Sequence, residues 1–532
     1  MCLLVPVSLS CYATRLVLPP TECEDSQTVV TADTSAENLC WLRAAYPDAR
    51  IVGTGKSLIL ARLEQRFGNE ISVAAVEGLA RFHPELSARS VMTRHQAVCL
   101  SLFAIVLTLS ILLWPGDAWR ALAIVASTGF LTGALFRCGL AWIGGAASPQ
   151  SVPSADDDAS LPPYTILVPL YHEANVLPRL VEALLELAYP SDKLDIKLIV
   201  ESDDVETTTI AGRLAQDFGF HLVRVPEGTP RTKPRACNYA FALARGDFTV
   251  IYDAEDRPEP DQLRKAVARF RSEPCELVCL QARLNFYNWN ENWLTRLFAL
   301  DYALWFDALL PALETLRVPM PLGGTSNHFR TSALKEVGAW DPYNVTEDAD
   351  LGIRLAQAGM RVSMLDSTTF EEAPTGLAAW LKQRSRWLKG YMQTWLVHMR
   401  DPVALQRRTG WLGFLSLQLF LGGSVVASLA NPLLWLMFLW TARFGFSGGA
   451  GQAVMSVSSL GLLSGNALLT WLAIMAPKRR DWRGVTPYAF AVTFYWALIS
   501  LAAWRGLWQL ATRPFYWEKT AHGLSRFEQP EP

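Results

Sequence analysis

Uncharged apolar runs occupy two zones of the chain, which are separated by a polar middle. The first zone holds the runs 97–116 and 121–136, and the second run extends through Arg137 to Trp142. Each run approaches the ~20 residues that a helix needs to cross ~30 Å of hydrocarbon. Only a hairpin-length connection lies between them, so the pattern predicts a transmembrane hairpin over 93–145. A buried helical hairpin in a soluble protein is the alternative.

The second apolar zone has three runs without charge, 411–442, 444–477 and 484–504. The first is longer than one helix needs, and Asn431-Pro432 interrupts it near its middle. Two short tilted spans fit, and so does one span with an in-plane helix. We expect two, which gives four membrane helices in 405–510, six in the whole chain and a cytoplasmic tail over 511–532.

This count conflicts with the basic loop at residues 478–483. With six helices, the loop falls on the side of the membrane opposite to the polar middle, against the tendency of Lys and Arg to stay inside. A single span in 411–442 would return the loop to the inside, but it would move the residues after 510 outside.

The polar middle alternates strand and helix patterns after an acidic linker at 151–160. Apolar, β-rich runs lie at 164–168, 194–200 and 248–252, and helical spacing appears at 174–187 and 208–218. Such alternation predicts an α/β domain with a mostly parallel sheet, over 160–400. Ligands of such sheets bind at the carboxyl ends of the strands.

The first 92 residues stand apart from both zones. Apolar residues at helical spacing, from Leu58 to Phe82, predict a small, mainly helical cytoplasmic domain. Residues 1–35 give no clear signal, and no motif in 1–92 indicates a second-messenger site.

Composition narrows the class of protein. The 48 basic and 50 acidic residues leave a net charge of -2, which disfavours a nucleic-acid binder. Apolar residues make up 51% of the chain and charged ones 18%, as expected of a membrane protein. The nine cysteines are scattered without a CxxC pair, so neither a disulfide scaffold nor a structural zinc site is expected. His172 and His328 have no second His at ligand spacing.

Three acids follow the strand predicted at 248–252, namely Asp253, Glu255 and Asp256. Carboxylates this close repel one another unless a cation neutralises them. Mg²⁺ or Mn²⁺ binds one or two protein carboxylates together with phosphate oxygens. The pattern therefore indicates a metal–phosphate site, with an exposed acidic loop as the alternative.

Two further motifs each allow two interpretations. In Thr346-Glu347-Asp348, a carboxylate is placed to act as a general base, or Thr346 caps a helix whose first turn is acidic. The segment from Gln383 to Trp387 belongs to a basic amphipathic helix. This helix either lies on the membrane surface or binds a sugar diphosphate. Elsewhere, Asp203 and Asp204 end the second predicted strand, and Lys233 is a candidate partner for an anion.

Taken in order, these motifs resemble those of processive family 2 glycosyltransferases, the group of cellulose, hyaluronan and chitin synthases. The matching segments are 168–173, Asp203-Asp204, 233–238, 253–256, Thr346-Glu347-Asp348 and 383–387. The last two look like the TED and QxxRW motifs of that group. The resemblance covers 160–400 and implies a GT-A fold.

The resemblance also implies residue roles. Tyr171, Glu173 and either Asp203 or Asp204 would hold the uridine. Lys233 would assist in binding the metal and diphosphate, and Asn238 would be a further substrate-binding residue. Asp253, Glu255 and Asp256 would bind the metal and diphosphate. Asp348, with Glu347 beside it, would be the general base. Gln383, Arg386 and Trp387 would hold the diphosphate and line the acceptor site, and Trp517, Lys519 and Thr520 would close over the nucleotide. Glu255 departs from the second Asp of the family's DxD motif, and His172 stands where Asn is common.

The function implied by the resemblance is inverting transfer of a sugar from a UDP-sugar to a growing polysaccharide. It implies Mg²⁺ or Mn²⁺, a catalytic domain on the cytoplasmic side of a bacterial-type inner membrane, and secretion of the product across that membrane. An export or regulatory partner is compatible with this. Two alternatives stay open, a glycolipid synthase with a lipid acceptor and a non-catalytic receptor. Five C-terminal tryptophans either line a channel or face lipid, namely Trp435, Trp440, Trp471, Trp496 and Trp504.

Overall fold

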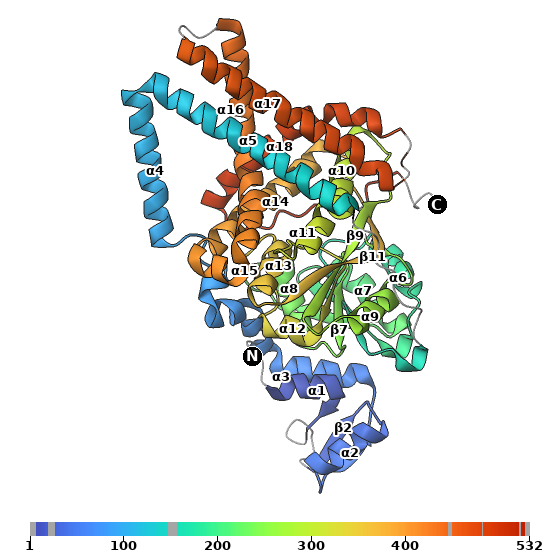
Figure 1. Ribbon diagram of the computed structural model, residues 1–532. Coiled ribbons are helices and arrows are strands. Elements are labelled where there is room, and N and C mark those ends of the chain that lie inside the picture. Colours follow the sequence, from blue (N-terminus) through green and yellow to red (C-terminus); the bar gives the residue numbers. More distant parts are fainter. Residues whose placement is uncertain are drawn as a thin grey trace. The chain divides into compact units, whose positions relative to one another are not determined.

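The computed structural model describes residues 7–19, 27–146, 157–444, 449–480, 482, 484–520 and 523–526. The chain divides into two compact units, and each is described by itself. The first contains residues 1–84, 152–280 and 325–342, and the second contains 85–151, 281–324 and 343–532. Most of the linker expected at 151–160 lies outside the described residues. Figure 1 shows the elements along the chain.

A central sheet forms the core of the first unit. Its strands follow the order β6 (His221–Val225), β5 (Leu194–Glu201), β4 (Tyr164–Leu170), β7 (Phe248–Ile251) and β10 (Asn327–Arg330). The strand after β10 in this order is β9 (Leu277–Phe286), whose last residues belong to the second unit. The β6–β5, β5–β4 and β4–β7 pairs are parallel, whereas β7 and β10 are antiparallel. The strands expected at 164–168, 194–200 and 248–252 are confirmed, in a mixed sheet of the GT-A type.

Helices connect these strands in the manner of βαβ units. Helix α6 (Leu177–Leu185) lies between β4 and β5, and α7 (Val205–Phe218) packs against β5 and β6. Helix α8 (Lys233–Phe241) packs against β4 and β5, and α9 (Gln262–Ser272) follows β7. Asp204 caps α7 by accepting the N–H of Thr207 at 3.1 Å, and Gly219 ends it in the left-handed conformation.

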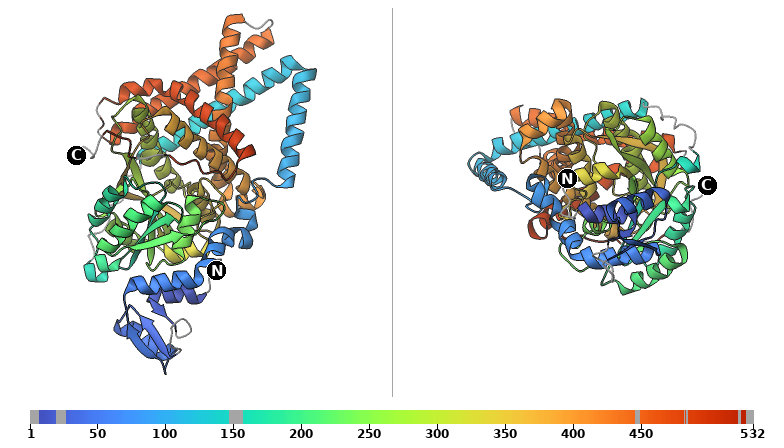
Figure 2. Two further views of the ribbon diagram at one scale, coloured as in Figure 1. Left: turned by 180° about the vertical axis from the view of Figure 1, so that it is seen from behind. Right: turned by 90° about the horizontal axis from the view of Figure 1, so that it is seen from below.

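The N-terminal region was expected to be mainly helical, but it also contains a small sheet. Strand β2 (Thr28–Thr31) pairs antiparallel with β1 (Val17–Leu18) and parallel with β3 (Arg50–Gly53), and α2 (Ala36–Ala45) connects β2 to β3. The views in Figure 2 show this sheet beside α2. The strands have two to four residues, too few for a clear alternation of apolar and polar positions.

Helix α3 (Lys56–Phe82) joins this region to the central sheet through buried charges. Lys197 of β5 is fully buried, and its ammonium lies 3.1 Å from the carboxylate of Asp195. Lys56 of α3 contacts the same carboxylate at 3.5 Å, and Glu64 of α3 lies 4.0 Å from His221. Such pairing offsets part of the desolvation cost of the buried charges.

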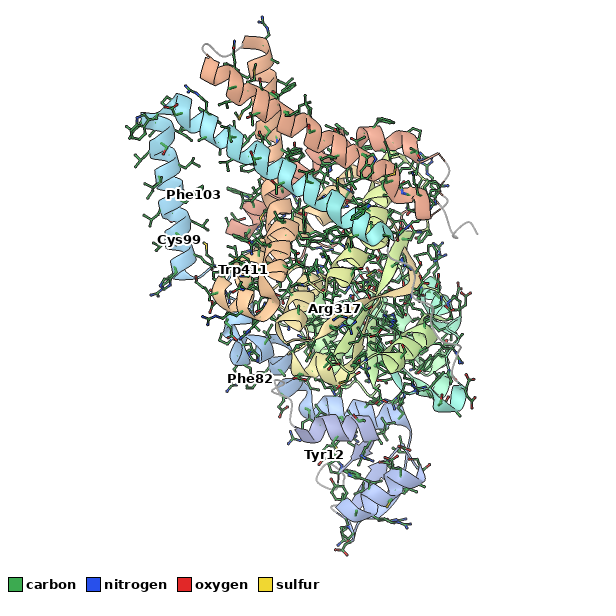
Figure 3. The ribbon with its side chains drawn as sticks, in the orientation of Figure 1. Tyr12, Phe82, Cys99, Phe103, Arg317 and Trp411 are labelled. Carbon is green, nitrogen blue, oxygen red and sulfur yellow. The ribbon has the colours of Figure 1, made fainter. Side chains whose placement is uncertain are left out.

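The second unit contains the apolar helices. Five helical segments in the described residues are long and apolar enough to cross a membrane, at 94–113, 115–146, 402–440, 451–478 and 486–512. Helix α4 (Arg94–Leu113) has no buried residue, and Cys99 and Phe103, which are labelled on it in Figure 3, are both exposed. Helix α5 (Pro115–Ala146) lies along α17 (Gly449–Met475). Helices α4 and α5 thus occupy the segment 93–145, and its role as a transmembrane hairpin stays a prediction.

The expectation of two short spans in 411–442 is wrong. Helix α15 (Pro402–Leu417) is interrupted at Gly410. From Trp411 the chain continues through the π-helical turn η6 (Gln418–Gly422) and α16 (Gly423–Phe444) as one helical run, and Pro432 lies inside α16. The backbone bends at Gly410, whose φ of 73° is in the left-handed region. A proline need not end a helix when neighbouring helices surround it.

Helix α18 (Val492–Thr512) runs alongside α14 (Leu377–His398) in the same direction. The indole N–H of Trp380 donates to Tyr495 Oη at 3.2 Å. Further along, a Cβ on Gly506 would lie 2.8 Å from the carbonyl oxygen of Ser385. Lys389 Nζ then donates to the carbonyl oxygen of Arg513 at 3.4 Å. Both ends of α18 therefore contact α14.

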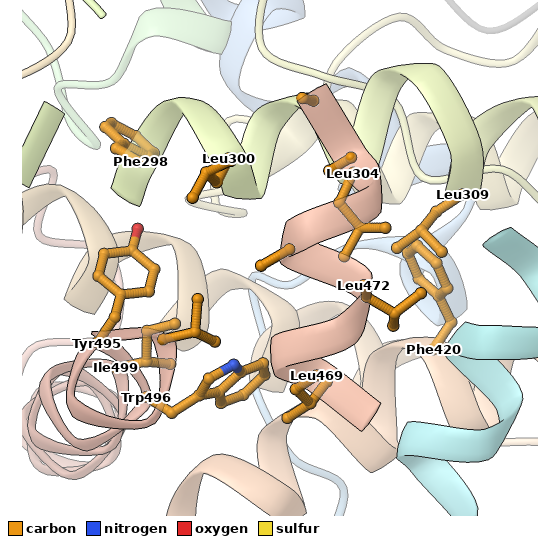
Figure 4. Packing of buried hydrophobic residues seen from close by; sticks show 14 of the residues in the cluster. Phe298, Leu300, Leu304, Leu309, Phe420, Leu469, Leu472, Tyr495, Trp496 and Ile499 are labelled. Carbon is orange, nitrogen blue, oxygen red and sulfur yellow. The ribbon is translucent and has the colours of Figure 1, made fainter. Parts of the chain in front are cut away.

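The apolar core of the second unit is built from these helices. Phe298, Leu304, Phe420, Leu472 and Trp496 are buried members of one cluster. The first two come from one helix and the other three from three further helical segments. Figure 4 shows these side chains packed against one another. Helix α10 (Trp293–Leu304), the π-helical turn η5 (Trp305–Leu309) and α11 (Leu310–Leu316) carry part of this core.

Removal of the charge of Glu64 should stabilise the protein in a pH-dependent way. Burial raises the pKa of Glu64 to about 7, and its Oε1 has no hydrogen-bond partner. Because this pKa lies above the unfolded value, the carboxyl contributes most to stability at low pH, and that contribution is lost as the pH rises to about 7. We expect Glu64→Gln to raise the unfolding free energy by at most about 3 kcal/mol at pH 8.

The measurement is the thermal unfolding of both proteins in detergent. At about pH 3 the two midpoints should coincide, since Glu64 is then protonated in the folded and the unfolded chain alike. A difference of equal size at both pH values would show that packing, not charge, is responsible.

Candidate active site

The loop after β7 holds the acidic cluster of the first unit. The N–H of Asp253 donates to Asp256 Oδ2 at 2.7 Å, and the N–H of Asp256 donates to the carbonyl of Asp253 at 3.1 Å. Thr325 also donates its hydroxyl to Asp256. Asp256 is fully buried, so the structure uses it to hold the turn. It leaves Asp253 and Glu255 as the more accessible acids of the motif.

Lys233, the first residue of α8, forms an ion pair with Asp253, and the two side chains are 14% and 29% exposed. Burial raises the pKa of Glu255 well above its ordinary value, and the charges of Asp253 and Glu173 raise it further, while Lys233 lowers it. The acids thus concentrate negative charge at the carboxyl end of β7, where one lysine offsets only part of it.

The donor set at this position suits a hard divalent cation. Among the described residues, no group of three His, Cys, Asp or Glu side chains is arranged to hold a metal. Asp253 and Glu255 nevertheless supply the one or two carboxylates that Mg²⁺ typically takes from a protein when phosphate and water complete its shell. The residues therefore fit a metal that is held jointly with a diphosphate.

A second polar group lies at the ends of β4 and β5. Arg231 donates to Asp203 Oδ2 at 2.6 Å and to Tyr171 Oη at 3.3 Å. The carboxylate of Glu173 accepts the N–H of Tyr171 at 3.2 Å. The structure thus brings Tyr171, Glu173 and Asp203 together. Sequence reasoning missed Arg231, although its place two residues before Lys233 was a usable signal.

Asp204 and Asn238 are engaged with the backbone. Asp204 Oδ2 accepts the N–H of His172 at 2.5 Å, besides capping α7. Burial alone would raise the pKa of Asp204, but these hydrogen bonds hold it below its ordinary value. The amide of Asn238 donates to the carbonyls of Ala75 and Trp340 at 3.2 and 2.7 Å. The structure therefore places Asn238 as a tie between α8 and α3, apart from the acidic cluster.

In the second unit, the acids of the TED motif begin α13 (Glu347–Gln357). Thr346 occupies the N-cap position, but its side chain makes no capping hydrogen bond. Glu347 is 5% exposed, whereas Asp348 is half-buried and accepts the N–H of Ala349 at 2.7 Å. A Cβ on Gly324 would lie 3.3 Å from Asp348 Oδ2. Asp348 is thus the more accessible acid, with a small residue beside it.

Helix α14 contacts the residues that precede α13. Gln393 accepts the N–H of Val345 at 3.1 Å, and Thr394 accepts a hydrogen bond from the Asn344 amide at 2.9 Å. A Cβ on Gly390 would lie only 2.3 Å from Thr346 Oγ1. The position of Asp348 therefore depends on close contact between the two helices at Gly390.

The residues of the QxxRW motif lie on the first half of α14. The guanidinium of Arg386 lies 4.5 Å from the ring centre of Trp517. The ring of Trp387 packs against Tyr302, with ring centres 6.1 Å apart, and Arg384 lies 4.7 Å from the Trp387 ring centre. Arg384 in turn pairs with Asp301 at 2.5 Å. The motif thus combines cations with aromatic faces.

The segment 513–520 lies against the same helix. Lys389 Nζ donates to the carbonyl of Tyr516 at 2.7 Å, and Gln393 donates to the carbonyl of Pro514 at 3.1 Å. Burial lowers the pKa of Lys389 to about 8, with a smaller contribution from nearby Arg386. The buried atoms Gln383 Oε1 and Thr520 Oγ1 have no hydrogen-bond partner among the described residues. Polar groups of this kind are expected at a ligand site.

Comparison with known proteins identifies the central domain. Residues 162–390 match the family described as "Glycosyltransferase like family 2". The chain is 28% identical over 447 residues to a "Beta-monoglucosyldiacylglycerol synthase" of Synechocystis, covering 80% of this chain and 87% of that protein. It is 26% identical over 267 residues to a "Probable glucomannan 4-beta-mannosyltransferase 10" of Arabidopsis thaliana, which covers 47% of each chain. It therefore spans less than half of the second relative.

Among solved structures, the chain is similar to a mannosyltransferase of Pyrobaculum calidifontis in complex with GDP-Man and Mn²⁺. The identity is 18%, the TM-score is 0.44, and the match covers 74% of this chain and 99% of the other. The matched residues 162–390 carry the acidic cluster, the TED motif and the QxxRW motif. Residues 162–390 thus match the family 2 glycosyltransferase model.

Proposed function

We propose that this protein is a membrane-bound, inverting glycosyltransferase that moves a sugar from a UDP-sugar to an acceptor hydroxyl. The observation that carries the proposal is the cluster of Asp253, Glu255 and Lys233 at the carboxyl end of β7, within a family 2 domain. This is the edge of an α/β sheet at which ligands bind. An acidic cluster with one lysine suits a metal–diphosphate better than a neutral ligand.

In the proposed reaction, Asp253 and Glu255 hold Mg²⁺ or Mn²⁺, which would stabilise the charge that develops on the departing diphosphate. Tyr171, Glu173 and Asp203 contact the nucleoside. Asp256 and Asp204 shape the two loops, as their backbone hydrogen bonds suggest. Lys233 contributes positive charge beside the acids.

For the second unit we propose a general base and a set of side chains that bind a diphosphate. Asp348 takes the proton of the acceptor hydroxyl as it attacks the anomeric carbon. Its greater exposure favours it over the buried Glu347. Gln383, Arg386, Lys519 and Thr520 bind the diphosphate, and Trp387 and Trp517 offer flat faces to the sugars. One displacement inverts the anomeric centre, so an α-linked donor gives a β-linked product without a covalent intermediate.

The acceptor is a growing glycan in the first form of the proposal. A lipid acceptor is the second candidate, and one observation favours it. Trp440, Trp471 and Trp504 are 64%, 47% and 46% exposed on the helices, while Trp496 is buried in the packed core. These tryptophans therefore suit lipid contact and packing better than a common sugar channel. The size of the product that membranes make from a labelled UDP-sugar separates the two candidates.

We further propose that the chain crosses the membrane four times and that α18 lies on the side of the catalytic domain. After α17, Arg480 pairs with Asp307 of η5, and Trp482 stacks on Trp289 with ring centres 5.1 Å apart. Because α18 follows α14 along its length, its apolar face contacts protein as well as lipid. The basic loop 478–483 and the segment 513–520 then share one side, as the positive-inside tendency requires.

Asp348→Asn should abolish sugar transfer and leave UDP binding within about twofold, because the amide keeps the shape of the side chain but cannot take a proton. A donor screen with purified protein, with and without EDTA, first identifies the active donor. Turnover and UDP affinity are then compared in both proteins. Full turnover in the variant would refute the assignment of the base.

Gly390→Ala should lower turnover at least about tenfold, since the new methyl group must displace Thr346 and with it the start of α13. Gly376→Ala is the matched control on the same helix, because nothing lies within 4 Å of the position of its Cβ. Turnover at saturating donor is the measurement. Equal turnover in both variants would show that α13 tolerates the shift.

A cysteine at position 478 should react from the side of the catalytic domain. Lys478 is exposed and lies in the basic loop. Lys478→Cys, in a chain whose nine native cysteines are serines, is labelled with an impermeant maleimide in inside-out and in right-side-out vesicles. Glu182→Cys in the catalytic domain marks one side, and Gly116→Cys at the start of α5 marks the other. Labelling of position 478 together with position 116 would contradict the proposed topology.

A further inference from the structure

The carboxylate of Glu372 accepts hydrogen bonds from three consecutive backbone N–H groups near the end of the chain. Gly523 donates to Oε2 at 2.6 Å, and Leu524 and Ser525 donate to Oε1 at 2.8 and 2.7 Å. Tyr287 adds its hydroxyl at 3.1 Å. Glu372 is only 6% exposed, so water contributes little to its solvation. Hydrogen bonds to a charged group are the stronger kind.

Glu291 reinforces the same contact. It accepts the hydroxyl of Ser525 at 2.7 Å and the N–H of Arg526 at 3.3 Å. We name residues 523–526, together with Glu372 and Glu291, the clasp. Two carboxylates and the backbone N–H groups of four successive residues take part in it. This is more hydrogen bonds than an isolated surface ion pair makes.

Hydrogen bonds fix the backbone next to Glu372. Glu372 lies between β11 (Arg361–Glu371) and the start of α14. The side chain of Asn288 accepts the N–H of Ala373 at 2.8 Å and donates to its carbonyl at 2.9 Å. Asn292 donates to the carbonyl of Thr375 at 3.0 Å. The position of Glu372 is therefore fixed relative to the helix that carries Gln383 and Arg386.

The segment 513–520 is fastened before the clasp as well. Lys389 and Gln393 bind the carbonyls at its start. In its middle, Glu518 receives two hydrogen bonds from Arg505, both at 2.7 Å, and one from Gln509 at 3.1 Å. Trp517 and Thr520 therefore lie between two fixed points of the chain, the start of the segment and the clasp.

We infer that Glu372 is a positioning residue, which holds Trp517 and Thr520 in register with Arg386 by fixing the chain three residues beyond Thr520. This rests on the proposed function, in which these side chains contact the donor diphosphate. A carboxylate near a diphosphate site would repel the donor, and the three N–H groups of the clasp offset that negative charge. The clasp thus serves donor binding more than the chemical step.

The test compares Glu372→Gln with a chain truncated after Thr520, which keeps Trp517, Lys519 and Thr520 but loses the N–H donors of the clasp. Glutamine is close in size, but it is neutral and offers only one acceptor oxygen. We expect each change to raise the KM for the UDP-sugar about tenfold and to leave kcat within about twofold. Because both remove the same interaction, the combined variant should be no worse than the truncation alone.

Glu182→Gln, which removes an exposed carboxylate of α6, is the control and should leave both constants unchanged. An unchanged KM in Glu372→Gln, or a fall in kcat with KM constant, would overturn the inference. Additive effects of the two changes would overturn it too.

A second readout does not depend on activity. Tryptic cleavage after Lys519 should be at least about fivefold faster in Glu372→Gln than in the native chain, because release of the clasp exposes the segment. Equal cleavage rates would contradict the clasp. If the native protein transfers no sugar but cleavage still responds, the proposed function fails while the anchoring role of Glu372 stands.

Discussion

Helix α14 is the element on which the second unit depends, because glycines allow two other helices to approach it closely. At Gly390 the start of α13 comes within the space that a methyl group would need, and at Gly506 the backbone of α18 does the same. The carbonyl oxygens of the segment 513–520 are bound by Lys389 and Gln393 of the same helix. The proposed base, the basic motif and the C-terminal segment are thus all placed by the packing of one helix.

In the first unit, the important feature is the cluster of acids after β7. Three acids follow β7 within four residues, and the fold assigns them different tasks. Asp256 is buried and holds the turn, whereas Asp253 meets Lys233 and remains partly exposed. Behind α8, the contact of Asn238 with α3 links the N-terminal region to the helix that presents Lys233. The N-terminal helix α3 therefore supports one part of the proposed donor site.

The apolar helices differ in how far the protein buries them, and hydropathy alone does not show this difference. Helix α4 has no buried residue, whereas α18 packs along α14 and contributes Trp496 and Ile499 to the core. Both are long and apolar enough to span a membrane. The difference lies in their partners, and it allows the basic loop 478–483 and the segment 513–520 to share one side in the proposed topology.

The sequence by itself determined the α/β alternation of the central domain, the strands that precede Asp203 and Asp253, and the likeness of the domain to family 2 glycosyltransferases, because periodicity and local motifs are properties of neighbouring residues. The resemblance also named Trp517 and Thr520 as candidate contacts of the nucleotide. Only the tertiary structure decided that 411–444 is one continuous helical run, that α18 follows α14, that Asp256 and Asn238 bind backbone groups, and that Glu372 anchors the C-terminal segment. Each of these depends on contacts between residues far apart in the chain, which no local pattern records.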